Sequence, residues 1–133
     1  MQDITEENLS LLFAHIEEAG LTVDRTSQQI RLPEWCNSVK IDVGLSHNAP
    51  MTAEWLRRQP EGLVVFCFEP LDANIQSSKQ AVKNLIETNG IKSKPVFLQF
   101  ALGQSEGIQD MFVTPDPGQS SFLEPLKVDV VTV

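Results

Sequence analysis

Three apolar runs alternate with two segments of helical periodicity in the middle of this 133-residue chain. The runs cover residues 39–43, 63–68 and 96–102, and their β-branched and aromatic side chains are typical of strands inside a sheet. Apolar side chains recur at helical spacing over residues 51–59 and 73–89. Such alternation predicts an α/β fold with a mostly parallel sheet, whose strands are joined by right-handed crossovers. The first of these strands would lie at the centre of the sheet.

The segment before these runs has a different pattern. Residues 4–19 carry an apolar face typical of a helix, and residues 21–23 and 30–32 alternate as a short hairpin does. We therefore expect an N-terminal helix and hairpin extension over residues 1–37, which would cover one sheet edge or make a dimer contact. Residues 38–133 would form the Rossmann-like domain.

Composition excludes several classes of function. Acidic residues outnumber basic ones and the formal charge is −8, which argues against binding to nucleic acid, since phosphate binding needs clustered Lys and Arg. Cys36 and Cys67 are too few for a disulfide scaffold, and neither has a Cys or His at metal-ligand spacing. The N-terminus is acidic and no apolar run is long enough to span a membrane. These features predict a cytoplasmic protein without a metal site or a membrane partner.

The carboxyl ends of parallel strands meet at one edge of a sheet, which is where α/β folds bind ligands. Gly44, Glu69 and Ala101 lie at or near these ends. Glu69 follows Gly44 by 25 residues, and dinucleotide-binding folds place a ribose-binding carboxylate about 20 residues after their Gly-rich turn. Pro70 holds Glu69 in an extended conformation. From spacing alone, a ribose ligand and a solvated acid at a strand end are equally supported.

The turn after the first strand has only Gly44 and lacks the Gly-x-Gly-x-x-Gly pattern that pyrophosphate binding needs. A cofactor without phosphate demands less of the backbone, which favours S-adenosylmethionine over NAD or FAD. Asp42 can meet the ammonium group of such a cofactor, or it can cap the turn that follows. An NAD-type domain is a weaker alternative because of the single Gly.

These residues resemble the FkbM-type S-adenosylmethionine-dependent methyltransferases, whose motifs match in order and spacing from about residue 38 to 125. The matching pieces are Ile41-Asp42-Val43-Gly44, Leu45-Ser46-His47-Asn48-Ala49-Pro50, Phe68-Glu69-Pro70, Phe100-Ala101-Leu102-Gly103 with Gly107, and Ser120-Ser121. The resemblance implies a partial, doubly wound sheet of the type found in class I methyltransferases.

The resemblance also implies roles for individual residues. Asp42, Gly44 and Leu45 would border the methionine end, Glu69 would bind the ribose, and Ala101 and Leu102 would border the adenine. Ser46, Asn48 and Pro70 belong to the same motifs and complete the predicted cofactor site. The implied reaction is O-methylation of a small-molecule acceptor, a sugar or metabolite hydroxyl.

Two further sites are open to two interpretations each. His47 lies in the loop beside the predicted crevice and can titrate near neutral pH, but a single His in a turn is more often a hydrogen-bonding loop residue. Ser120 and Ser121 are equally consistent with a ligand contact and with ordinary loop composition. No residue is identified as a general base, and the catalytic residues stay unknown.

The chain departs from the family after Thr132 and Val133, where family members continue into a strand that pairs with the free side of the first strand. We expect a truncated domain whose first strand must be covered, by a homodimer or by a rearranged terminus. The alternative function is a non-catalytic, truncated methyltransferase-like module for dimerisation or binding.

Overall fold

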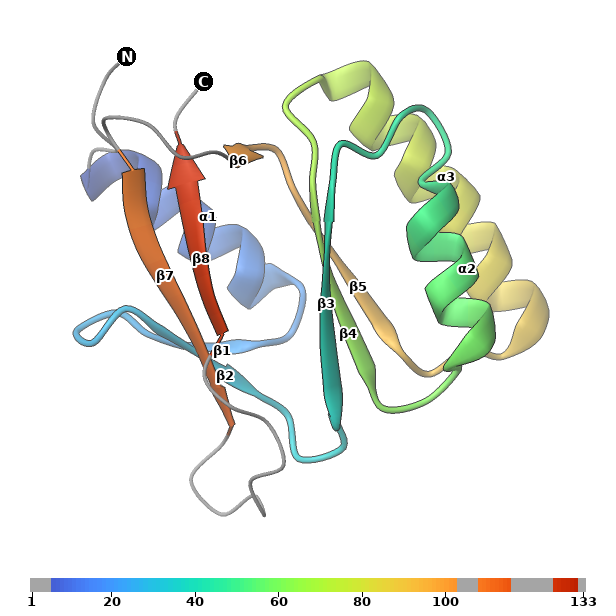
Figure 1. Cartoon of the computed structure of the whole chain (residues 1–133), viewed down its shortest axis with the longest axis horizontal. Helices are drawn as coiled ribbons and strands as arrows, with labels where there is room; N and C mark the ends of the chain where they lie inside the picture. Colours follow the sequence, from blue (N-terminus) through green and yellow to red (C-terminus); the bar gives the residue numbers. More distant parts are fainter. Residues whose placement is uncertain (1–5, 103–107, 116–125, 132–133) are drawn as a thin grey trace. The chain divides into compact units, whose positions relative to one another are not determined.

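The computed structural model describes the backbone of residues 6–102, 108–115 and 126–131, and the side chains of residues 9–100 (Figure 1). The chain divides into two compact units, one of residues 36–99 and one that joins Met1–Trp35 to Phe100–Val133. The first boundary lies close to the expected one after residue 37. The unit that begins there ends at Gln99, however, whereas we expected it to continue to residue 133.

Residues 36–99 form an α/β unit with a three-stranded parallel sheet, which is compatible with a partial Rossmann-like fold. Both helices cover the same face of this sheet, as Figure 1 shows. The elements follow one another as β3 (Ser38–Val43), α2 (Pro50–Arg58), β4 (Leu63–Phe68), α3 (Asp72–Asn89) and β5 (Lys94–Leu98).

The strand order in this unit is β3-β4-β5, so β4 is central and β3 lies at an edge among the described residues. The prediction that the first strand is central was therefore wrong for this sheet. Two successive right-handed crossovers move the chain in the same direction, and they place the second of three strands in the middle.

The predicted third strand over residues 96–102 is two separate strands. β5 ends at Leu98 and pairs with β4, whereas β6 (Ala101–Leu102) pairs with a strand of the other unit's sheet. The apolar run continues through Gln99 and Phe100 without a Gly or Pro, so the local pattern carries no sign of the break.

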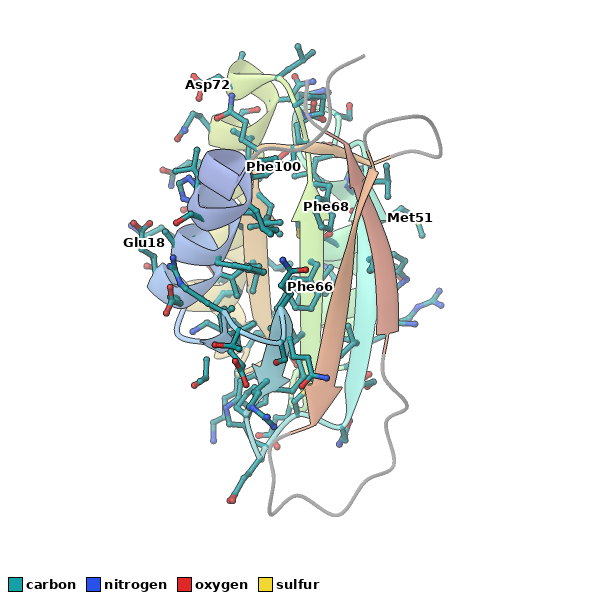
Figure 2. All side chains as sticks on the ribbon, turned by 90° about the vertical axis from the view of Figure 1, so that its left-hand side faces the viewer. Glu18, Met51, Phe66, Phe68, Asp72 and Phe100 are labelled. Carbon is teal, nitrogen blue, oxygen red and sulfur yellow. The ribbon has the colours of Figure 1, made fainter. Side chains whose placement is uncertain are left out.

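The central strand β4 is buried at all six positions. Leu63, Val65 and Cys67 belong to the core that β4 forms with the two helices, while Phe66 and Phe68 occupy the alternate positions (Figure 2). A strand that is apolar on both faces needs cover on both, which explains its continuous hydrophobic sequence. The other members of the core beneath the helices are Leu45, Ala49, Leu56, Ile75, Val82 and Ile91.

The long helix α3 ends as predicted but begins differently. Gly90 adopts a left-handed conformation with φ of 62° and donates its N–H to Ile86 O, which closes the last turn. Leu71 occupies the N-cap position, and its side chain forms no capping hydrogen bond. Asp72 is the first helical residue, where its charge still suits the positive end of the helix dipole.

The other unit contains a five-stranded sheet in the order β1-β2-β7-β8-β6. The predicted hairpin is confirmed, because β1 and β2 pair antiparallel. β2 pairs in parallel with β7, so that Ile30 lies opposite Val113, and both β7 and β6 pair antiparallel with β8. The elements not yet bounded are α1 (Glu6–Glu18), β1 (Thr22–Asp24), β2 (Gln29–Leu32), β7 (Ile108–Pro115) and β8 (Leu126–Val131).

The helix α1 packs on β1 within this unit. Its buried stripe of Leu12, Phe13 and Ile16 confirms the predicted apolar face. Arg25, in the hairpin turn, forms an ion pair with Glu17 and donates a hydrogen bond to Ser10 Oγ at 2.9 Å. Among the described residues, no helix is long and apolar enough to cross a lipid bilayer.

Candidate functional site

The turn after β3 is built from an unusual series of backbone conformations. Gly44, Ser46 and Ala49 have φ values of 76°, 58° and 48°, in the left-handed region that side chains disfavour. Gly44 N–H donates to Phe68 O at 2.9 Å, and Ala49 N–H donates to Leu45 O at 2.9 Å. A Cβ placed on Gly44 would meet nothing within 4 Å, so a ligand can approach the backbone closely at this point.

Glu69 lies at the tip of β4 and connects the ends of the three strands. Its Oε1 accepts the N–H of Leu45 at 2.9 Å, from the turn after β3. Its Oε2 accepts the N–H of Leu71 at 3.0 Å, and its own N–H donates to Leu98 O at 3.1 Å, at the end of β5. The side chain is 4% exposed. Each carboxylate oxygen has a second lone pair, which leaves acceptor capacity for a ligand.

Asp42 caps the helix that follows it. Its Oδ2 accepts the Thr52 hydroxyl at 2.6 Å and the Thr52 N–H at 3.2 Å, in the first turn of α2. The N-cap position, Ala49, has no side chain that could do so, and a carboxylate there also suits the helix dipole. This contact agrees with the capping alternative for Asp42. Its Oδ1 accepts no hydrogen bond from a residue that the structure describes, and Asp42 as a whole is 7% exposed.

Two serines of α3 hold the turn from the other side. Ser77 Oγ donates to His47 O at 2.5 Å, and Ser78 Oγ donates to Ser46 O at 3.4 Å. Neither serine was predicted from the sequence as a site residue, and Thr52 was not predicted either. A hydroxyl residue in the first turn after an Asp-x-Gly strand end is a signal that could have identified Thr52, whereas the serines carry no comparable local pattern.

The remaining predicted residues of this unit contribute in different ways. Leu45 packs its side chain into the core at 0% exposure, so only its backbone faces the turn. Ser46, Asn48 and Pro70 are exposed at the same edge of the sheet. His47 is exposed too, and its Nδ1 lies 3.4 Å from Ser46 Oγ. The interpretation of His47 as a loop residue that forms hydrogen bonds agrees with these contacts.

Four predicted residues are not joined to this edge by any described contact. Ala101 and Leu102 form β6, which belongs to the other unit and is described by its backbone alone. Ser120 and Ser121 lie outside the described residues. The candidate site is therefore the part that residues 42–71 build within one unit.

Apolar side chains stand exposed beside the two buried carboxylates. Val43 ends β3, Met51 lies in the first turn of α2, and Leu71 precedes α3, with exposed fractions of 58%, 52% and 61%. Each of these positions is at the carboxyl edge of the parallel sheet, and Figure 2 labels Met51. The edge thus offers apolar surface and hydrogen-bond acceptors together, as small-molecule sites commonly do.

Cys67 lies beneath this edge, with its Sγ 3.5 Å from Thr52 Oγ1. Burial raises the pKa of the Cys67 thiol to about 12, so that the group stays neutral and is not an activated nucleophile. Within the side chains that the structure describes, no group of three His, Cys, Asp or Glu is arranged to hold a metal ion.

No family model matches the chain, and no curated protein or solved structure is significantly similar to it. The resemblance to FkbM-type methyltransferases therefore stays a prediction from the motifs.

Proposed function

We propose that residues 36–99 form the cofactor-binding part of an S-adenosylmethionine-dependent, methyltransferase-like protein of the class I type. The observation that carries the proposal is the position of Glu69. Its carboxylate is at the tip of the second parallel strand and is bonded to the turn that follows the first. A carboxylate at this position can accept hydrogen bonds from both hydroxyl groups of a ribose.

The chemistry of the neighbouring groups supports the same ligand. S-adenosylmethionine carries no phosphate, so one open glycine, Gly44, meets its need for close backbone approach. The unpaired Oδ1 of Asp42 suits an ammonium group, and exposed Leu71 suits the flat apolar face of an adenine.

When bound, the cofactor would supply an electrophilic methyl group on its sulfonium. The residues of this edge would bind and orient it, so that a hydroxyl oxygen of a sugar or metabolite could attack the methyl in line. Positioning is the only catalytic contribution that we assign to these residues.

Isothermal titration of the full chain with S-adenosylmethionine and with NAD tests the proposal. Glu69→Gln should weaken S-adenosylmethionine binding roughly 10- to 100-fold, since hydrogen bonds to charged groups contribute about 1.5–3 kcal/mol. Glu61→Gln is the matched control, because Glu61 is exposed before the opposite end of β4 and pairs only at the surface with Lys92 at 3.7 Å.

The proposal fails if the unaltered chain binds no S-adenosylmethionine, or if Glu69→Gln leaves the affinity unchanged. A far-UV circular dichroism spectrum of each variant shows whether the fold persists. This check matters because the amide of Gln would turn a donor toward the N–H of Leu45 or Leu71.

A second candidate function is a binding or dimerisation module without catalysis. The bonding of Glu69 favours it, because both carboxylate oxygens already accept backbone N–H groups and the side chain is 4% exposed. In this case, titration with S-adenosylmethionine or with NAD gives no heat of binding. The one effect of Glu69→Gln is then a lower free energy of unfolding. Heat with NAD alone would instead identify a dinucleotide-binding domain.

A further inference from the structure

The edge strand β3 has a row of backbone groups that pair with no described strand. Of the strands that the structure describes, β4 is the one bonded to β3, and Gly44, directly after β3, donates its N–H to Phe68 O of β4. Backbone groups along a strand point to alternate sides, so the N–H and C=O groups of Val39, Ile41 and Val43 point away from β4. Such a row is a template for another strand.

We propose that this edge pairs with β3 of a second copy of the chain, antiparallel and with Ile41 on the two-fold axis. In this register Ile41 faces Ile41 of the second copy, and Val39 faces Val43. These are the hydrogen-bonded positions of an antiparallel ladder, and all the outward-pointing groups of both strands find partners. The result is one continuous sheet of six strands, and the inference does not depend on any cofactor.

The charges of β3 select this register. Lys40 and Asp42 lie on the same side of the strand, since the Lys40 ammonium stands 5.4 Å from the Trp55 ring of α2 while Asp42 bonds to Thr52 of α2. With Ile41 at the centre, Lys40 faces Asp42 of the second copy on both sides of the axis. These are the non-hydrogen-bonded positions, where opposite Cα atoms are only about 4.5 Å apart.

The neighbouring registers are less favourable both in the charges that they bring together and in the backbone hydrogen bonds that they form. A shift that brings Val39 opposite Ile41 places Lys40 opposite Lys40, and the reverse shift places Asp42 opposite Asp42. Like charges directly opposite each other are destabilising. Each shift also leaves outward-pointing backbone groups unpaired. A strand that is complementary to itself in only one register favours a second copy over an unrelated partner.

The same pairing would also bury exposed apolar side chains of β3. Val43 is 58% exposed and Ile41 is partly exposed. Facing valines and isoleucines from a second strand would cover these side chains. α2 packs on β4 and α3, which leaves Lys40 exposed at this edge of the unit.

Light scattering on the full chain measures the association. We expect twice the 14.8-kDa chain mass. Lys40→Glu would set two carboxylates opposite each other at both pairs and weaken the dimer by about tenfold or more. Lys79→Glu makes the same charge change on the exposed surface of α3 and should leave the mass doubled. A monomeric mass for the unaltered chain, or a dimer indifferent to Lys40→Glu, overturns the proposal.

Oxidative cross-linking tests the register even if Lys40→Glu fails to fold. Ile41→Cys would place two thiols at facing positions with Cα atoms about 5.5 Å apart, within the range of a disulfide. Lys40→Cys would face Asp42 instead and should cross-link far more slowly. Cys36 and Cys67 are buried and contribute little background. Equal cross-linking of the two variants overturns the register. The edge of β3 would then pair with a strand from elsewhere, or the two chains would associate through a different interface.

Discussion

At the scale of single residues, two buried carboxylates fix the turns at the carboxyl edge of the parallel sheet. Glu69 accepts the N–H of Leu45, and Asp42 accepts the hydroxyl of Thr52. Glu69 precedes a Pro at the end of an apolar run, and its position at the strand tip follows from local rules. Its partners, the N–H groups of Leu45 and Leu71, depend on the path of the turn, which no local pattern specifies. The same holds for Asp42, whose capping role becomes visible only when Thr52 is brought above it.

Cys67 provides a prediction at this scale. Burial raises the pKa of its thiol to about 12, from an ordinary value of 9.0. The folded state therefore retains a proton that the unfolded chain releases above pH 9. The stability that the neutral Cys67 thiol contributes to the folded state is fully present below pH 9, and it is lost as the pH rises from 9 toward 12. At pH 10 we expect a loss of about 1 kcal/mol from this thiol, relative to pH 8.

Urea unfolding at pH 8 and pH 10 measures this loss, with Cys67→Ala as the reference. The variant should lose less stability between the two pH values than the unaltered chain, although it is less stable at both. Burial also raises the pKa of Cys36, and since this thiol is present in both proteins its effect cancels. An identical pH dependence in the two proteins would contradict the prediction.

At the scale of elements, periodicity located the helices and strands of the unit that spans residues 36–99. β4 has the predicted bounds, and α3 and the hairpin lie where expected. The break between β5 and β6 was missed because β6 is fixed by its pairing with β8, a contact distant in sequence. The edge position of β3 was missed for a similar reason, since strand order depends on neighbours and not on the strand's own residues.

Two glycines at opposite ends of strands give a prediction about the turns. Gly44 and Gly62 have φ values of 76° and 84°. A Cβ at Gly44 would meet no atom, so Gly44→Ala should cost only backbone strain, about 1 kcal/mol. A Cβ at Gly62 would lie 2.7 Å from Asn37 Nδ2, and that amide accepts a hydrogen bond from Gln59 at 2.9 Å. Displacing it adds about another 1 kcal/mol.

The free energies of unfolding of the two variants, from urea titration, decide the matter. Gly62→Ala should be the less stable of the two. Equal losses would show that the Asn37 amide moves aside without cost. A larger loss for Gly44→Ala would mean that the turn after β3 is more constrained than its open surroundings indicate.

At the scale of the whole molecule, the division into units was only partly predictable. The boundary near residue 36 coincides with the change from hairpin to parallel sheet, which the sequence pattern shows. The later part of the chain joins the N-terminal segment because β7 pairs with β2. No sequence feature of Gln29–Leu32 specifies this partner, because short alternating strands can pair with many others.

This pairing has a consequence for the order in which the chain acquires its structure. The parallel β3-β4-β5 sheet joins strands that follow one another, whereas β2 must wait for β7, so that Ile30 meets Val113 only after the intervening chain has been made. Closing so long a loop is slow until the segment within it is compact. On the ribosome, the N-terminal hairpin would therefore emerge first and complete its sheet last.

Pulsed hydrogen exchange during refolding measures this order. The amides of Leu63–Phe68 should become protected before those of residues 108–114 in β7. Simultaneous protection, or the reverse order, would contradict it. If the order holds, the hairpin has an unpaired edge throughout synthesis, and the exposed side of β2 is the place where a chaperone or a second nascent chain would first bind.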